Sequence, residues 1–159
     1  MRNMNKILNV LMICHGNICR SPMAEFVLRD LVKKAGLEDR IGVASAATSS
    51  EEIGNPVYPP AKRELAKHGL SCAGKTARRM TARDYDAYDY LVYMERYNLR
   101  NMLRIVDDPE GKMRSLMSFA GSDEDIDDPW YTGDFSGVYA QIERGCRGLL
   151  EELKAQLRA

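Results

Sequence analysis

Short apolar runs and amphipathic segments alternate along this chain. The apolar runs are rich in β-branched and aliphatic side chains, as buried strands are, and they cover residues 7–13, 41–48, 88–94 and 114–118. Helical spacing or helix end signals mark residues 21–35, 61–68, 81–85, 95–103 and 135–153. Strands that alternate with helices predict an α/β fold, here a four-stranded parallel sheet with helices on both faces.

The last helix has the clearest apolar stripe. Its apolar side chains recur every three or four positions and therefore share one face. Cys146 falls within this stripe, which predicts a core thiol. The stripe consists of Phe135, Val138, Tyr139, Ile142, Cys146, Leu149, Leu150 and Leu153.

The first strand leads directly into a sharp turn and a helix. Gly16 and Asn17 are residue types that readily adopt a positive φ, and Ser21-Pro22 is a typical helix start. A loop curled before a helix N-terminus directs several backbone N–H groups into one concavity, where the helix dipole adds positive potential. The pattern therefore predicts a phosphate-binding loop made of His15, Gly16, Asn17, Ile18, Cys19, Arg20 and Ser21.

Candidate chemistry converges on this loop. Cys14 stands at its mouth, where the same field favours the thiolate, the nucleophilic form of cysteine. Arg20 is spaced so that its planar guanidinium can bind a tetrahedral anion through two parallel hydrogen bonds. Ser21 can donate its hydroxyl hydrogen to the thiolate. These three residues predict nucleophilic attack on a bound phosphate ester.

The contiguous string Cys14-His15-Gly16-Asn17-Ile18-Cys19-Arg20-Ser21-Pro22 resembles the signature of the low-molecular-weight protein tyrosine phosphatases. The resemblance covers nearly the whole chain and implies one phosphatase domain over residues 1–159. It also implies hydrolysis of phosphotyrosine and aryl phosphate monoesters through a phosphocysteine intermediate, without metal or cofactor. The implied substrate is a phosphotyrosine-containing protein or a small aryl phosphate.

A second string, Asp127-Asp128-Pro129-Trp130-Tyr131, resembles the Asp-Pro-aromatic-aromatic motif of the same family. The resemblance makes Asp128 the acid that protonates the leaving oxygen and then the base that activates water. It also implies that Asn17, Ser21 and Ser45 hold the phosphate loop in shape through hydrogen bonds.

The rim of the site follows from the same resemblance. Trp130 and Tyr131 form one aromatic wall, while the facing loop offers Glu51 and Glu52 in place of a second aromatic residue. Cys19 lies five residues after Cys14 on the curled loop, and we expect it to be the redox partner of the nucleophile.

Three residues depart from the family pattern. His15 replaces the usual apolar residue after the nucleophile, and we expect it at the pocket mouth, either against the substrate or facing solvent. Lys75 stands near the place of a buried histidine, and Glu95 stands in place of an aspartate. Both are expected around the phosphate loop.

Two alternative functions compete with this interpretation. Residues 69–76, from Gly69 to Thr76, match the nucleotide-binding pattern G-x-x-x-x-G-K-[ST], which requires a strand before it and a helix after it. A charged, helix-forming segment precedes it instead, which favours a helix end and a loop. An arsenate reductase of the same fold would need a further pair of nearby cysteines, and Cys72 and Cys146 lie far apart in the sequence.

Composition narrows the class of protein further. The chain has 159 residues, with 23 basic and 23 acidic side chains, so no basic field favours nucleic acid. No apolar run is long enough to insert into a membrane, and residues 1–5 run straight into the first strand, which leaves no room for a signal peptide. Four cysteines without such a signal predict free thiols and a cytoplasmic location.

Overall fold

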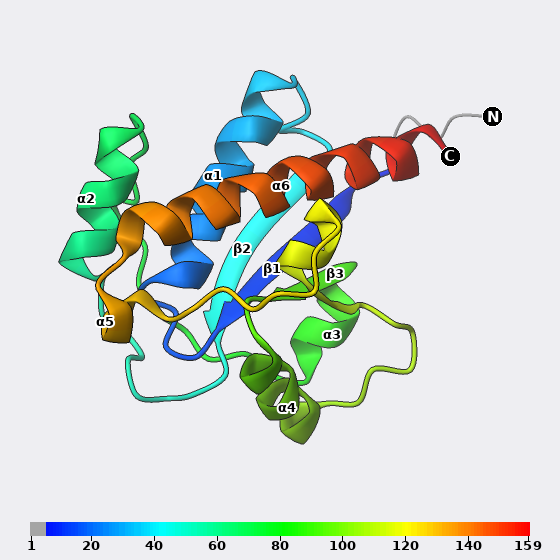
Figure 1. The fold of residues 1–159 in the computed structure, drawn as a ribbon. Helices are drawn as coiled ribbons and strands as arrows, with labels where there is room; N and C mark the ends of the chain where they lie inside the picture. Colours follow the sequence, from blue (N-terminus) through cyan, green and yellow to red (C-terminus); the bar gives the residue numbers. More distant parts are fainter. Residues whose placement is uncertain (1–5) are drawn as a thin grey trace.

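Four parallel strands form one sheet with the order β2-β1-β3-β4 (Figure 1). They belong to a computed structural model that describes residues 6–159, so the expectation for residues 1–5 lies outside the described part. The strands are β1 Leu8–Cys14, β2 Ile41–Ala47, β3 Tyr90–Tyr93 and β4 Met113–Ser115. The helices are α1 Arg20–Lys34, α2 Pro59–Lys67, α3 Arg83–Ala87, α4 Arg96–Ile105, the 3₁₀ helix η1 Leu116–Ala120, α5 Pro129–Thr132 and α6 Phe135–Arg158.

Helices cover both faces of the sheet because β1 is apolar on both sides. Val10 and Met12 point into one buried cluster, whereas Leu11 and Ile13 point into another, as the alternation of a strand requires. Helices α1 and α6 pack on the first face, and α3 and α4 lie on the second. This arrangement confirms the predicted sheet and its two helical layers.

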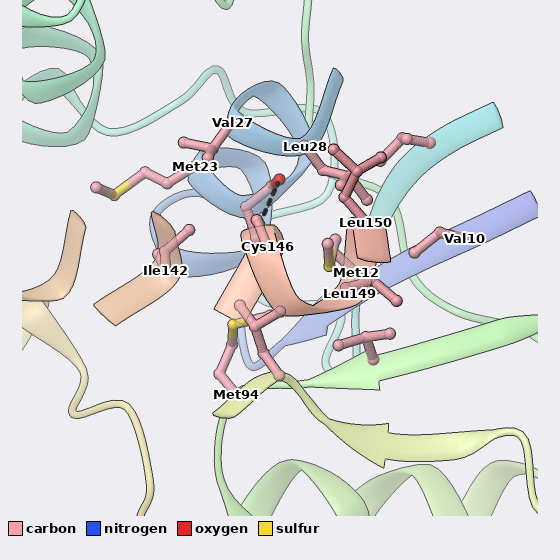
Figure 2. Close-up of a cluster of buried hydrophobic side chains, with 14 of the residues drawn as sticks. Val10, Met12, Met23, Val27, Leu28, Met94, Ile142, Cys146, Leu149 and Leu150 are labelled. Atoms are coloured by element: carbon pink, nitrogen blue, oxygen red, sulfur yellow. Dashed lines mark hydrogen bonds between the residues drawn. The ribbon is translucent and has the colours of Figure 1, made fainter. Parts of the chain in front are cut away.

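Helix α6 crosses the first face of the sheet and provides much of its core (Figure 1). Cys146 is fully buried against α1, where its thiol lies 3.7 Å from the carbonyl oxygen of Ala24 (Figure 2). Burial raises the pKa of Cys146 well above the usual range of a thiol. The predicted core role of this cysteine is confirmed. Neither α6 nor any other helix within residues 6–159 has the length and apolarity needed to span a membrane.

The fourth strand is shorter than the sequence predicts. The prediction of a strand over 114–118 is wrong at its end, because β4 stops at Ser115 and η1 follows. The Ser115 hydroxyl accepts the backbone N–H of Ser118 at 3.1 Å and thereby caps η1. Gly148 of α6 lets this turn approach closely, since a Cβ there would collide with the carbonyl oxygen of Phe119.

Three further local predictions need correction. The third strand covers only Tyr90–Tyr93, and the segment between the predicted fourth strand and the last helix, for which no element is predicted, contains the short helix α5. The helix predicted over 81–85 begins later, because α3 covers Arg83–Ala87. The carboxylate of Asp84 accepts the backbone N–H of Thr81 at 2.8 Å, and so it fixes the chain ahead of the helix.

Candidate active site

A pocket opens at the carboxyl edge of the sheet, where β1 ends at Cys14 and α1 begins at Arg20. Asn17 makes the turn between them with a φ of +60°, whereas the positive φ expected at Gly16 does not occur. The pocket has a volume of about 160 Å³. Its lining consists of Cys14, His15, Gly16, Ile18, Cys19, Arg20, Glu51, Glu52, Asp128, Trp130 and Tyr131.

The Cys14 sulfur lies at the bottom of this pocket and receives three polar contacts. The backbone N–H groups of Asn17 and Ser21 donate to it at 3.3 and 3.4 Å, and the Ser21 hydroxyl lies 2.9 Å away. Donors that converge on one sulfur stabilise negative charge there. Three donors thus converge on the sulfur that the sequence predicts as the nucleophile.

The side chain of Asn17 fixes the direction of these contacts. Its Oδ1 accepts the backbone N–H of Arg78 at 3.2 Å, so its Nδ2 faces two serine hydroxyls. Nδ2 donates to Ser21 at 2.8 Å and to Ser45 at 2.9 Å. Because Ser21 accepts from Asn17, its own hydrogen is free to donate to Cys14. The three residues predicted to support the loop therefore form one hydrogen-bonded chain under it.

Glu25, for which no role is predicted from the sequence, ends this hydrogen-bonded chain. Its buried carboxylate accepts the Ser45 hydroxyl at 2.6 Å and pairs with Arg29 at 2.7 Å. The Lys75 ammonium lies 3.7 Å from the same carboxylate and donates to the Ser45 carbonyl at 3.0 Å. Burial lowers the pKa of Lys75, and the charge of Glu25 opposes that effect only in part. Lys75 thus lies next to the support of the loop, as expected.

Arg20 is almost fully buried and belongs to the lining of the pocket. Its Nη1 donates to the carbonyl oxygen of Ile126 at 2.8 Å and lies 3.1 Å from Glu95, and its Nη2 lies 3.5 Å from Asp128. Burial alone would lower the pKa of Arg20, but the negative charges of Cys14, Glu95 and Asp128 outweigh it, so the pKa is raised. The guanidinium is therefore a permanent cation beside the sulfur.

Asp128 faces this guanidinium from the start of α5. Its Oδ1 accepts the backbone N–H of Trp130 at 3.0 Å, which makes Asp128 the N-cap of the helix. Its other oxygen is the one that approaches Arg20. One carboxylate oxygen thus fixes the side chain, while the other faces the pocket.

The rim combines exposed aromatic rings with carboxylates. Trp130 is 52% exposed and Tyr131 is 84% exposed, and both line the pocket. Glu51 and Glu52 line the same pocket from another loop. His15 also lines the pocket, as expected for a residue at its mouth, and its Nε2 lies 3.2 Å from the Glu51 carboxylate.

Cys19 lines the same pocket as Cys14 but is itself buried. Burial is the main reason why the pKa of Cys19 is raised, and the negative charges of Cys14 and Asp128 add to it. Cys19 is consequently a neutral thiol beside the predicted nucleophile.

The alternative nucleotide-binding motif lacks the structure that it requires. Helix α2 ends at Lys67, just before residues 69–76, and no strand leads into them. No helix follows directly either, because Thr76 forms an isolated bridge with Pro56 and Arg79 another with Ala47. The interpretation of this segment as a helix end and loop is confirmed, with Gly69 at a φ of +76°.

A cysteine sulfur that receives donors near a helix N-terminus, in one pocket with a cation and a carboxyl group, is suited to accept a phosphoryl group. Fold and pocket together define a cysteine-dependent phosphatase. The chain belongs to the low molecular weight phosphotyrosine protein phosphatase family, whose model matches residues 9–159.

Individual relatives agree with this assignment. The chain is 35% identical over 153 residues to the low molecular weight protein-tyrosine-phosphatase YfkJ of Bacillus subtilis, with 94% of this chain and 98% of the relative covered. It is 38% identical to the low molecular weight phosphotyrosine protein phosphatase of Gallus gallus, with 92% and 96% covered. The crystal structure of YfkJ superposes with a TM-score of 0.93 and covers 97% of this chain and 99% of that one. The chain is thus a protein tyrosine phosphatase, and the arsenate reductase alternative gains no support.

Proposed function

We propose that this phosphatase uses Cys14 as nucleophile, Arg20 as the cation that holds the phosphate, and Asp128 as general acid and base. The convergence of three polar contacts on the Cys14 sulfur carries the proposal, because such contacts would stabilise negative charge on a nucleophilic sulfur. The loop N–H groups and Arg20 would then hold the three equatorial oxygens of the phosphate.

In the first step the Cys14 thiolate attacks phosphorus in line. A sulfur–phosphorus bond forms while the bond from phosphorus to the phenolic oxygen breaks. Protonated Asp128 transfers its proton to that oxygen, which leaves as a phenol. The lining of the pocket supports this role, since Asp128 and Cys14 both belong to it.

In the second step Asp128 acts as a base. It takes a proton from a water molecule, whose oxygen attacks phosphorus as the sulfur–phosphorus bond breaks. Inorganic phosphate leaves, the Cys14 thiolate is regenerated, and Asp128 is again protonated. Arg20 and the loop amides balance the charge on the transferred group in both steps. The proposed steps therefore need no metal ion for this purpose.

The substrate that fits best is phosphotyrosine in a protein. Trp130 and Tyr131 are exposed at the mouth of the pocket and can cover an aryl ring while the rest of a protein chain stays outside. We place the reaction in the cytoplasm, because the nucleophile must remain a free thiol and all four cysteines are free.

Hydrolysis of p-nitrophenyl phosphate with rapid mixing and mass spectrometry tests the mechanism. Wild type should release a burst of p-nitrophenol, retain activity with a metal chelator, and carry one added HPO₃ on the peptide that contains Cys14. Label on another residue, or no covalent intermediate under single-turnover conditions, would contradict the nucleophile assignment. An arsenate reduction assay on the same sample checks the discarded alternative.

A further inference from the structure

A second pocket adjoins the catalytic one and is not used by the chemistry above. It has a volume of about 490 Å³. His15, Glu51, Asp128 and Tyr131 line both pockets, so the two are continuous at the rim. The side pocket, as we name it here, is lined by His15, Glu51, Glu95, Tyr97, Asp127, Asp128, Tyr131 and Thr132.

We propose that the side pocket binds a basic side chain, arginine in preference to lysine, that lies near the phosphotyrosine of a peptide substrate. This inference rests on the proposed function, because the phosphotyrosine must occupy the catalytic pocket. An extended peptide advances about 3.3 Å per residue. A side chain one or two positions from the phosphotyrosine can therefore reach an adjoining pocket.

The charge of the side pocket favours a cation. Four of its lining side chains are carboxylates, and none of the lining residues is a lysine or an arginine. Asp127 is exposed and forms no ion pair with any other part of residues 6–159. Glu51 contacts His15 at 3.2 Å, which is an ion pair only while the imidazole is protonated.

The cations behind the pocket do not cancel this charge. Arg20 pairs with Glu95 and Asp128 from the catalytic side, but a bound phosphate dianion would take up that positive charge. The rim then faces the peptide with a surplus of carboxylates within one Debye length of the flanking residues. Acidic flanks should be repelled and basic flanks attracted.

The aromatic walls favour arginine over lysine. Tyr97 is 48% exposed and Tyr131 is 84% exposed, so both rings can receive a planar guanidinium. The His15 ring lies 6.1 Å from the Tyr97 ring at an angle of 32° and forms the back of this wall. Arg100 lies 5.8 Å from the Tyr97 ring centroid, so a substrate guanidinium would stack on the other face of this ring.

The experiment uses four series of phosphotyrosine peptides, one for each of the two positions before and the two positions after the phosphotyrosine. Within a series, the varied position carries Arg, Lys, Ala or Glu. At low ionic strength, kcat/KM should decrease in the order Arg, Lys, Ala, Glu for at least one position, with Arg exceeding Glu by about 10-fold. Most of the difference should lie in KM and should shrink at high salt. Equal kcat/KM for all four residues at every position would overturn the proposal.

Two variants locate the effect. Asp127→Asn and Tyr97→Leu change residues that line the side pocket but not the catalytic pocket. Asp127→Asn should lower the ratio of kcat/KM between Arg and Ala peptides by about 3-fold, and Tyr97→Leu should narrow the ratio between Arg and Lys. Each ratio compares kcat/KM for two peptides with the same variant, so a general loss of activity in that variant does not affect the ratio.

Asp123→Asn is the matched control, because Asp123 is an exposed carboxylate of the same acidic segment that lines neither pocket. An Arg preference that falls equally in the control, or that survives in both side-pocket variants, means that the side pocket is not the binding site. If wild type hydrolyses p-nitrophenyl phosphate but shows no flank preference, the side pocket fails while the proposed function stands. Absence of any hydrolysis refutes both.

Discussion

The ring of Tyr58 packs against the ring of Trp130, with 4.6 Å between their centroids and 46° between their planes. The backbone N–H of Tyr58 also donates to the carbonyl oxygen of Ile18 in the phosphate loop, at 2.9 Å. Trp130 in turn donates its backbone N–H to Asp128. Tyr58 therefore connects the loop that holds phosphate with the short helix that carries the acid.

This connection predicts that Tyr58→Leu misplaces the acid. We expect kcat to fall about 3- to 10-fold for aryl phosphates with poor leaving groups, which need full protonation, and less for those with good leaving groups. Tyr58→Phe keeps the ring and should behave like wild type. A series of substituted phenyl phosphates measures the slope. An equal loss along the series would mean that Tyr58 contributes only to stability.

Cys14→Ser should abolish turnover while vanadate or phosphate still binds, because the loop amides and Arg20 remain. Loss of a covalent nucleophile costs many orders of magnitude in kcat. Steady-state assays and calorimetric titration with vanadate give the two readouts. Residual activity within about tenfold of wild type would exclude Cys14 as the nucleophile.

Asp128→Ala should lower kcat by about 10²- to 10⁴-fold, the usual contribution of a positioned acid. The loss should be smallest for leaving groups that depart readily as anions. Asp127→Ala is the neighbouring control, since Asp127 does not line the catalytic pocket. If both variants lose the same activity with every leaving group, the acid has been misassigned.

The burial of Lys75 leads us to expect that the free energy of unfolding depends on pH. The pKa of Lys75 is lowered in the folded protein, chiefly by burial. At pH values between this lowered pKa and the 10.5 of an ordinary lysine, the unfolded chain therefore binds more protons than the folded one. The free energy of unfolding should therefore rise with pH across this window. Lys75→Arg keeps the charge but does not titrate there, so its stability relative to wild type should decline as pH increases. Urea titrations of both proteins at several pH values measure the difference, and parallel curves would contradict the shift.

Cys19 predicts reversible oxidation. Peroxide oxidises the Cys14 thiolate to a sulfenic acid, which the Cys19 thiol then attacks to form a disulfide and release water. Dithiothreitol should restore wild-type activity but little of the activity of Cys19→Ser. Cys72→Ser, which changes a buried thiol outside the catalytic pocket, should recover like wild type. Equal recovery of all three proteins would exclude a protective role for Cys19.

The sequence could predict what is contiguous. The loop from Cys14 to Ser21 is encoded in one string, because a strand, a turn and a helix start follow one another there. Glu25 and Tyr58 could not be predicted, because each acts through a partner far along the chain, Ser45 and Trp130 respectively. Only the folded sheet and loops bring these pairs together.

The pattern of apolar residues gave a wrong secondary structure where close packing between elements determines the backbone conformation. The apolar residues after Ser115 look like a continued strand, but η1 forms there under α6, against the bare backbone at Gly148. Helix α5 was missed for a different reason. It is only four residues long, and its stability comes from the Asp128 cap and the Trp130 contact more than from helix propensity.

Asn17 must meet two requirements with one residue. Its backbone must adopt a left-handed conformation, and its side-chain amide must donate to Ser21 and Ser45. Glycine would retain the left-handed backbone but would sever the amide from Ser21 and Ser45. Serine or glutamine would offer hydrogen bonds but resist the turn. Aspartate would accept the turn but replace the amide donors with a negative charge near the thiolate. None of these four substitutions meets both requirements.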